Sequence, residues 1–330
     1  MHHAPNFVYK TYHAFLRRNS AKYFQVFKPC SRPNSPISET SMGKLVEHLV
    51  SGFTLASLGF WHAFNTVRAY HANDSSKFTA RFWYPFRSPI CKLKNLELTL
   101  VMSFSISAIF MQILDFPSLH LSSKLENFEH ATMFLHLAIF SGFNLLAELS
   151  HLSETLSGVS GILAASVFAQ ELFLLHYHST DHIGLEGHYH GLLQLIVLVS
   201  LFAALVVTSC PSSFPAALVL SVSVILQGCW FIVMGFMLWV PKFIPQGCVA
   251  QLSDASSSIM QGAVVCETQE ASFRARALAN LQLSWMLSAV LIFVTGILLG
   301  FSRAFAPRGP LTEYKQGKTR ATDIHIAMKG

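Results

Sequence analysis

Charged residues are scarce in this sequence. Only 12% of its 330 residues are Asp, Glu, Lys or Arg, whereas about a quarter of an average soluble domain is charged. Hydrophobic residues make up 52% of the chain and include 28 Phe, and the mean hydropathy is +0.44. One core of this length could not bury so much apolar surface. The composition therefore argues against a soluble enzyme and favours an integral membrane protein.

Several motifs of soluble enzymes and of nucleic-acid-binding proteins are also missing. The sequence has no P-loop, no GxGxxG motif and no recognisable Ser-His-Asp arrangement. Its six Cys residues form no CxxC pair, so neither a zinc knuckle nor a dense secreted disulfide framework is indicated. The 23 Lys and Arg lie in tails and connecting loops and make no single basic face, so we expect no nucleic acid partner.

Seven apolar stretches are long enough, or nearly so, for the roughly 20 helical residues that cross a bilayer. They lie at residues 46–70, 97–115, 130–150, 155–176, 189–209, 215–240 and 277–301. Short turns at 151–153 and 210–215 predict two antiparallel helical hairpins. We therefore predict an all-α integral membrane protein, with a seven-transmembrane-helix bundle in residues 42–303, a basic N-terminal extension (1–41) and a basic tail (304–330).

The distribution of Lys and Arg predicts the orientation of this bundle. From Met42 onward, five of them lie on the N-terminal side of the membrane and twelve on the opposite side, which includes the tail. Because loops rich in Lys and Arg stay in the cytosol, we expect a cytosolic C-terminus. Residues 1–41 oppose this with six further positive charges. They are a targeting presequence, an interfacial amphipathic segment or an upstream extension absent from the mature protein, and we prefer the last interpretation.

Two neighbouring sequence blocks resemble the signature of a known family. They are Glu171–His178 (ELFLLHYH) and Leu185–Leu193 (LEGHYHGLL), and Asn280–Trp285 (NLQLSW) also matches. Over about residues 42–303 the chain is similar to the transmembrane protein 45 family, including its plant branch called viral-response proteins. The resemblance implies a seven-helix protein of the Golgi, endosomal or plasma membrane with unknown biochemistry. It supplies no catalytic residues.

Ionisable side chains within the predicted spans are candidates for a functional site, because each is costly in lipid unless it is paired or hydrated. Glu171 and His178 are seven residues apart and share one helix face. His188 and His190 begin the next span, but positions i and i+2 lie about 200° apart on a regular helix. Together with His130 they form a candidate metal or proton site. Carboxylate and imidazole ligands suit zinc or another first-row transition metal.

A second polar stripe follows the third predicted span. A projection at about 100° per residue places Asn144, Glu148 and His151 on the same face as His130. This secondary polar seam, with His48 from the first span, is either part of the functional site or a set of interhelical hydrogen bonds.

Two local patterns give further predictions. In the first span, Gly52 with Ala56 and Gly59 with Ala63 are small-xxx-small pairs, which indicate close helix packing. The aromatic run 82–86 is typical of a membrane interface.

Cys248 and Cys266 share the loop 241–276, which the predicted orientation places in an oxidising compartment. They are a candidate disulfide, and the alternative is two unrelated thiols.

Three functions remain open at this point. The first is a non-catalytic protein of endomembranes or the cell surface that acts in trafficking or interaction, through membrane lipid, protein partners or a homo-oligomer. The second is a metal-dependent intramembrane hydrolase, in which Glu171 and His ligands hold a metal that activates water. The third is a proton- or metal-coupled transporter, although no inverted repeat is apparent. We favour the first function and therefore do not expect an enzyme.

Overall fold

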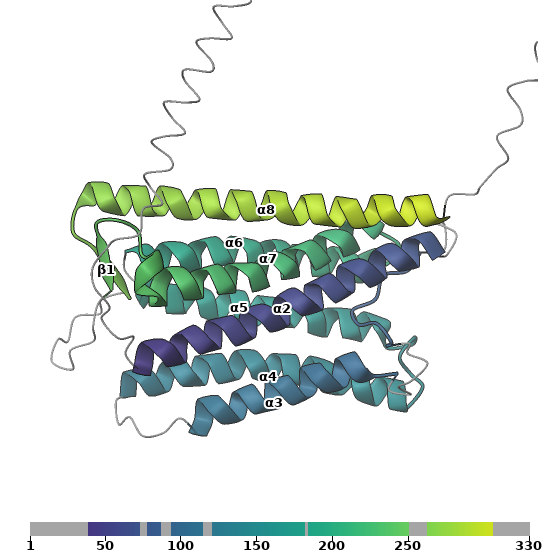
Figure 1. The fold of residues 1–330 in the computed structure, drawn as a ribbon. Helices are drawn as coiled ribbons and strands as arrows, with labels where there is room; N and C mark the ends of the chain where they lie inside the picture. The colour runs from purple at the N-terminus through teal and green to yellow at the C-terminus, as the bar shows by residue number, and fades with distance from the viewer. Residues whose placement is uncertain are drawn as a thin grey trace, which may run out of the picture.

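Long helices running side by side dominate the computed structural model, which describes residues 39–72, 78–86, 94–114, 121–181, 184–250 and 263–305 (Figure 1). The helices in this part of the chain are α2 (Glu39–Ala72), α3 (Leu96–Leu114), α4 (Leu121–Leu149), α5 (Ser157–Asp181), α6 (Leu185–Ser209), α7 (Phe214–Trp239), the short 3₁₀ helix η2 (Pro241–Phe243) and α8 (Gln269–Phe305). Strands β1 (Cys248–Ala250) and β2 (Val264–Cys266) form one antiparallel hairpin. Each predicted span corresponds to one long helix. Most of the predicted N-terminal extension and C-terminal tail lies outside the described residues.

Six of these helices, α3 to α8, are long and apolar enough to cross a membrane. Large apolar side chains cover their outer faces, such as those of Phe110, Ile162 and Ile292, which are 59%, 62% and 75% exposed. Such surfaces suit lipid rather than water. The described residues thus form an all-α, multi-helix bundle of the kind found in multi-pass membrane proteins. The remaining predicted span, 46–70, corresponds to α2, which is 34 residues long but is not among the six.

α2 packs against α7 more closely than ordinary side chains allow. A Cβ atom added to Gly59 would lie 2.6 Å from the backbone nitrogen of Ile225, and one added to Gly52 would lie 2.7 Å from the carbonyl oxygen of Gly228. Ordinary van der Waals contacts of a Cβ atom are 3.4–4 Å. The close packing predicted from the small residues of the first span is confirmed, and α7 is the partner helix.

The centre of the bundle is built on α6 and α7, and α8 lies along its outside (Figure 1). The rings of Tyr189 and Trp230 stack with their centroids 5.2 Å apart, and the indole nitrogen of Trp230 donates to the Tyr189 carbonyl at 3.0 Å. The Tyr189 hydroxyl donates to Oε1 of Gln282 on α8 at 2.7 Å. One tyrosine therefore joins three helices.

The segment 78–86 packs on the end of the bundle where α2 finishes. Phe78, Trp83 and Tyr84 are buried, each with 6% or less of its surface exposed. The backbone nitrogen of Ala80 donates to the Pro211 carbonyl at 2.7 Å. The prediction of an interfacial aromatic belt is therefore wrong for Trp83 and Tyr84, because these rings are buried by the protein itself.

Candidate functional site

A cavity of about 220 Å³ lies between α2, α3, α4, α5, α6 and α7, in the half of the bundle where α2 begins. Three carboxylates, three imidazoles and one ammonium group line it: Glu47, Glu171, Glu186, His48, His130, His190 and Lys44. The remaining wall is mostly apolar. Of the residues predicted as a metal or proton site, the structure thus brings Glu171, His130 and His190 to one cavity, together with His48 from the secondary set.

The cavity is polar at one end and apolar at the other. Along α2, Lys44, Glu47 and His48 come before Leu55 and Leu58, which line the wall nearer to the middle of the bundle. Helices α3 and α4 repeat this order, whereas on α5 the Glu171 carboxylate lies further into the bundle than Leu175. On α4, His130 precedes Phe134 and Leu137, and on α3, which runs the opposite way, Gln112 follows Val101 and Phe104. A bound molecule would meet polar groups near the end of the bundle and hydrocarbon further in.

Hydrogen bonds link α2 to α3 on both sides of this cavity. Near the end of the bundle, Gln112 donates to Oε1 of Glu47 at 3.4 Å. Towards the other end, Trp61 donates to Oε2 of Glu97 at 2.8 Å and His62 donates to Oε1 at 2.7 Å. Ser51, Thr54, Leu55 and Leu58 of α2 and Val101 and Phe104 of α3 line the cavity between these contacts. Side chains of α2 and α3 thus line one side of the cavity, with interhelical hydrogen bonds at both of its ends.

The tautomers of His48 and His190 follow from their hydrogen bonds. Nδ1 of His48 lies 2.8 Å from the Lys44 carbonyl, and Nδ1 of His190 lies 3.0 Å from the Glu186 carbonyl. A carbonyl oxygen only accepts, so Nδ1 carries the proton in both rings. In a neutral ring Nε2 is then a hydrogen-bond acceptor. Each neutral ring therefore has Nδ1 as its donor and Nε2 as its acceptor.

Glu171 places a carboxylate near the middle of the bundle. Its Oε2 accepts a hydrogen bond of 3.3 Å from Gln227, which lies halfway along α7. Gln227 is fully buried, and its own Oε1 has no hydrogen-bond partner in the described part of the chain. A carboxylate at this depth is costly unless it is neutralised by a proton or a cation.

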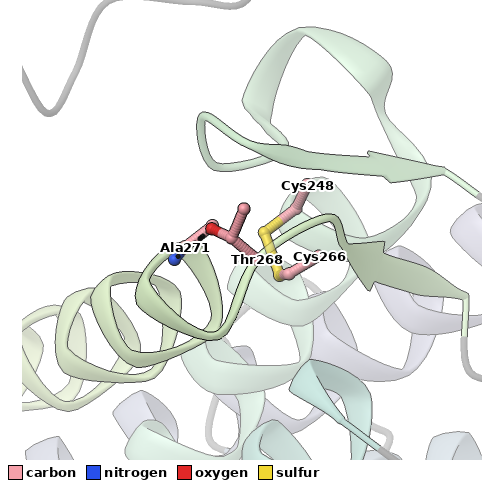
Figure 2. The surroundings of a disulfide bond; sticks show 4 residues. All are labelled: Cys248, Cys266, Thr268 and Ala271. Atoms are coloured by element: carbon pink, nitrogen blue, oxygen red, sulfur yellow. Dashed lines mark hydrogen bonds between the residues drawn. A yellow bond between two sulfur atoms is a disulfide. The ribbon is translucent and has the colours of Figure 1, made fainter.

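Glu186 joins the cavity to the β hairpin outside the bundle. It is 4% exposed, and its Oε2 accepts a hydrogen bond of 2.6 Å from the backbone nitrogen of Ala263. Strand β2 begins at the next residue, and Cys266 at its end forms a disulfide with Cys248 of β1 (Figure 2). The structure therefore contains the candidate disulfide, and the loop that carries it reaches a carboxylate of the cavity.

The α8 helix starts directly after this hairpin. The Thr268 hydroxyl accepts a hydrogen bond of 3.1 Å from the backbone nitrogen of Ala271, in the first turn of α8 (Figure 2). Such an N-terminal cap fixes where the helix begins. The disulfide, the cap and the Glu186 contact thus occupy the same end of the molecule as the polar end of the cavity.

Other candidate residues lie away from the cavity. His188 is on the opposite side of α6 and its Nε2 lies 2.9 Å from Oδ1 of Asn280 on α8, as expected for two residues about 200° apart on a regular helix. His178 belongs to α5, but its side chain lies outside the described residues. Among the described side chains, no three His, Cys, Asp or Glu groups are close enough together to hold a metal ion.

The residues of the secondary polar seam on α4, Asn144 and Glu148, interact with different partners. Asn144 is buried, donates to the Phe140 carbonyl at 2.8 Å and accepts from the Ser160 hydroxyl on α5 at 2.7 Å. Glu148 forms an ion pair of 2.8 Å with Lys94. His151 is exposed in the turn after α4. These contacts fix α4 against its neighbours, and none of the three residues lines the cavity.

A buried polar centre at the other end of the bundle was not predicted. Besides Trp61 and His62, the backbone nitrogen of Tyr84 donates to Glu97, at 2.8 Å, and the Tyr84 hydroxyl lies 2.9 Å from Oγ1 of Thr66. Burial raises the pKa of the Tyr84 hydroxyl above its usual value. One carboxylate thus fastens α2, α3 and the segment 78–86 together.

Glu47 and Glu186 line the cavity but were not predicted as site residues. Glu47 precedes the first predicted span with its neighbour His48, and only a helix that continues outward, as α2 does, turns it towards the other helices. Glu186 comes before the predicted span 189–209, whereas α6 begins one residue before it and buries its side chain. The pairing of Glu and His in both places is the signal that could have been used.

Residues 157–299 match the model of a family of unknown function (DUF716). The matched region runs from α5 into α8 and includes Glu171, Glu186 and His190. It covers less than half of the chain and carries no assigned biochemistry. The narrower resemblance to the transmembrane protein 45 family rests on the sequence blocks alone.

Proposed function

We propose that this protein is a seven-span membrane protein of endomembranes or the cell surface that binds a small amphipathic molecule of the bilayer in its cavity. It acts through that binding, in trafficking or interaction with partners, rather than by catalysis. The observation that supports the proposal is the order of groups along α2, α3 and α4, which is polar near the end of the bundle and apolar towards the middle, with Glu171 on α5 as the exception. A lipid or other amphiphile in one leaflet is oriented in the same way.

Several features support α2 as the seventh span. α2 pairs along its length with α7, which is apolar enough to cross the membrane. Its 34 residues correspond to about 51 Å at 1.5 Å per residue, which exceeds the roughly 30 Å of bilayer hydrocarbon. With seven spans, the Lys and Arg distribution favours a cytosolic C-terminus. The polar end of the cavity then lies on the side of the lumen or the cell exterior.

A carrier is the second candidate, and a specific observation favours it. Glu171 is a carboxylate near the middle of the bundle whose hydrogen-bond partner is a neutral amide, and such a group could take up and release a proton as a substrate moves. The hydrolase has less support, because the described side chains do not gather three metal ligands.

Photocrosslinking tests the proposal directly. The purified full-length protein in lipid nanodiscs is irradiated with a photoreactive long-chain alcohol, and the labelled peptides are mapped by mass spectrometry. We expect labels on cavity residues of α2, α3 and α5. Ser51→Trp places a large side chain in the cavity and should abolish that labelling, whereas Ser103→Trp on the exposed side of α3 should leave it unchanged.

The proposal would be refuted by labels spread evenly over the outer faces of the helices, with no effect of Ser51→Trp. Labelling of the outer faces is expected in every sample, so the comparison is made on cavity peptides. Equal thermal stability of the two Trp variants ensures that a loss of labelling reflects the filled cavity.

A further inference from the structure

We propose that Glu171 and Gln227 together form a proton-binding site in the middle of the bundle. At neutral pH the Glu171 side chain is a carboxylic acid, whose proton on Oε1 is donated to Oε1 of Gln227. The hydrogen bond from Nε2 of Gln227 to Oε2 of Glu171 is present in both protonation states. This site deepens the second candidate function, the carrier, and rests on it for what the proton does.

The hydrogen bonding of Glu171 is weak for a charged group. Glu97 accepts three hydrogen bonds of 2.7–2.8 Å, and Glu186 accepts one of 2.6 Å. Hydrogen bonds to an ionised carboxylate are usually about 2.7–2.9 Å long. Glu171 accepts from Nε2 of Gln227 at 3.3 Å, and no other described residue lies within hydrogen-bond or ion-pair distance of it. A carboxyl group inside a bundle with so little stabilisation of its charge is neutral.

Gln227 has an acceptor that the proton of Glu171 would satisfy. Its side chain is fully buried, and its Oε1 has no hydrogen-bond partner within the described ranges. A buried acceptor without a partner is costly. A carboxylate has no donor to offer it, whereas a carboxylic acid has one O–H. An acid and an amide pair through two hydrogen bonds, one in each direction, and Gln227 already provides the one from Nε2.

Glu171 lies between the cavity and Gln227. Glu171 lines the cavity, and on α7 the lining residues Val224 and Phe231 lie on the same side of the helix as Gln227. The cavity volume of about 220 Å³ has room for several water molecules. On release, the O–H bond of Glu171 breaks, its electron pair stays on Oε1 and the proton passes to water in the cavity. Gln227 contacts the carboxyl group from the protein side.

Six other titratable side chains face the same cavity from the helices around Glu171. They are Lys44, Glu47 and His48 on α2, His130 on α4, and Glu186 and His190 on α6. The lining residues of α3 and α7 include no titratable side chain. None of the six makes a hydrogen bond or ion pair with Glu171 in the described part of the chain. Gln227 is therefore the residue on which the experiment acts.

Infrared spectroscopy tests the site, because a carboxylic acid has a C=O stretching band that a carboxylate lacks. The full-length protein is measured in nanodiscs of ether lipids, which have no ester carbonyl. At neutral pH the wild type should show the band, and alkaline buffer should remove it reversibly. Glu171→Gln should lack the band, and Glu171→Asp, which keeps the acid, should shift it. Glu154→Gln, which removes an exposed carboxylate, should leave it unchanged.

Gln227→Leu tests the partner of the proton. It removes the amide and keeps a side chain of similar size in a buried position. The band should persist but move to higher frequency, because the Glu171 carboxyl group loses its hydrogen bonds. Gln112→Leu is the matched control, since Gln112 is also an amide that donates to a glutamate, Glu47, at 3.4 Å. That variant should leave the band in place.

The outcomes separate this site from the functions proposed above. No difference between the wild type and both Glu171 variants would mean that Glu171 is ionised and would overturn the inference. An unchanged band in Gln227→Leu would overturn Gln227 as the partner, and a band that alkaline buffer does not remove would overturn the release of the proton. Reconstituted vesicles that show the band but take up no protons would refute the carrier and leave the site. Failure of the photocrosslinking with the band intact would refute only the binding of an amphiphile.

Discussion

Replacing Gly228 by Ala should destabilise the bundle, because two helix backbones meet at this glycine. The added Cβ would lie 2.5 Å from the carbonyl oxygen of Gly52 and 2.7 Å from Cα of Ala56, whereas ordinary contacts begin at 3.4 Å. These are backbone atoms and cannot rotate away, so α2 and α7 would have to separate by about 1 Å. Overpacking of this kind costs about 1–3 kcal/mol of unfolding free energy.

A matched glycine on α8 provides the control. Gly296 is also within a helix, but a Cβ added there would have no atom within 4 Å. Ala is the better helix former by about 1 kcal/mol at either position, so the difference between the two variants isolates the clash. At roughly 2–4 °C per kcal/mol for a chain of this size, Gly228→Ala should melt several degrees below Gly296→Ala.

Thermal unfolding of both purified variants in the same nanodiscs measures this difference, with monodispersity checked before heating. If Gly228→Ala melted at the same temperature as Gly296→Ala, α2 would not approach α7 as closely as described here. α2 would then lack the close helix partner that supports it as a membrane span.

Two further changes test the ends of the bundle. Glu97→Ala should lower the unfolding free energy by about 2–4 kcal/mol, because it leaves the buried donors of Trp61 and Tyr84 unpaired; a melting temperature equal to that of Glu154→Ala would contradict this. Cys248→Ser should destabilise the protein by about 3 kcal/mol, as expected for a bridge that closes a loop of 18 residues. The control variant is Cys210→Ser, which replaces an exposed free cysteine. Alkylation of both cysteines without reductant would show that the bridge does not form.

The helices could be predicted because their signal is local. A run of apolar residues long enough to cross a bilayer is visible in one segment, and Pro215 at the start of α7 marks a boundary in the same way. The opposite directions of His188 and His190 also followed from helix geometry alone. The sequence of one helix, however, does not show which other helix it packs against. The pairing of α2 with α7 depends on surfaces that are far apart in the sequence.

The site was harder to predict for the same reason. Glu186 is buried because the backbone of Ala263, 77 residues later, donates to it. The donors to Glu97 from α2 come from residues 35 and 36 positions earlier. In both cases a residue at the edge of a predicted helix gains its partner from another part of the chain. The sequence therefore identifies ionisable residues that can form a site. It does not show which of them lie close together in the fold.

The contact between Gly52 and Gly228 also constrains how the protein is made. These residues are 176 positions apart, so at about 5–20 residues per second α2 is synthesised roughly 10–35 s before the helix it packs against. During that interval its glycine-lined face has no α7 to meet. α2 is also the one long helix of the described chain that falls short of the apolarity of the others. As a seventh span, α2 would therefore depend for stable insertion on the later arrival of α7, and a ribosome stalled before that helix should leave α2 accessible to the quality-control proteases of the membrane.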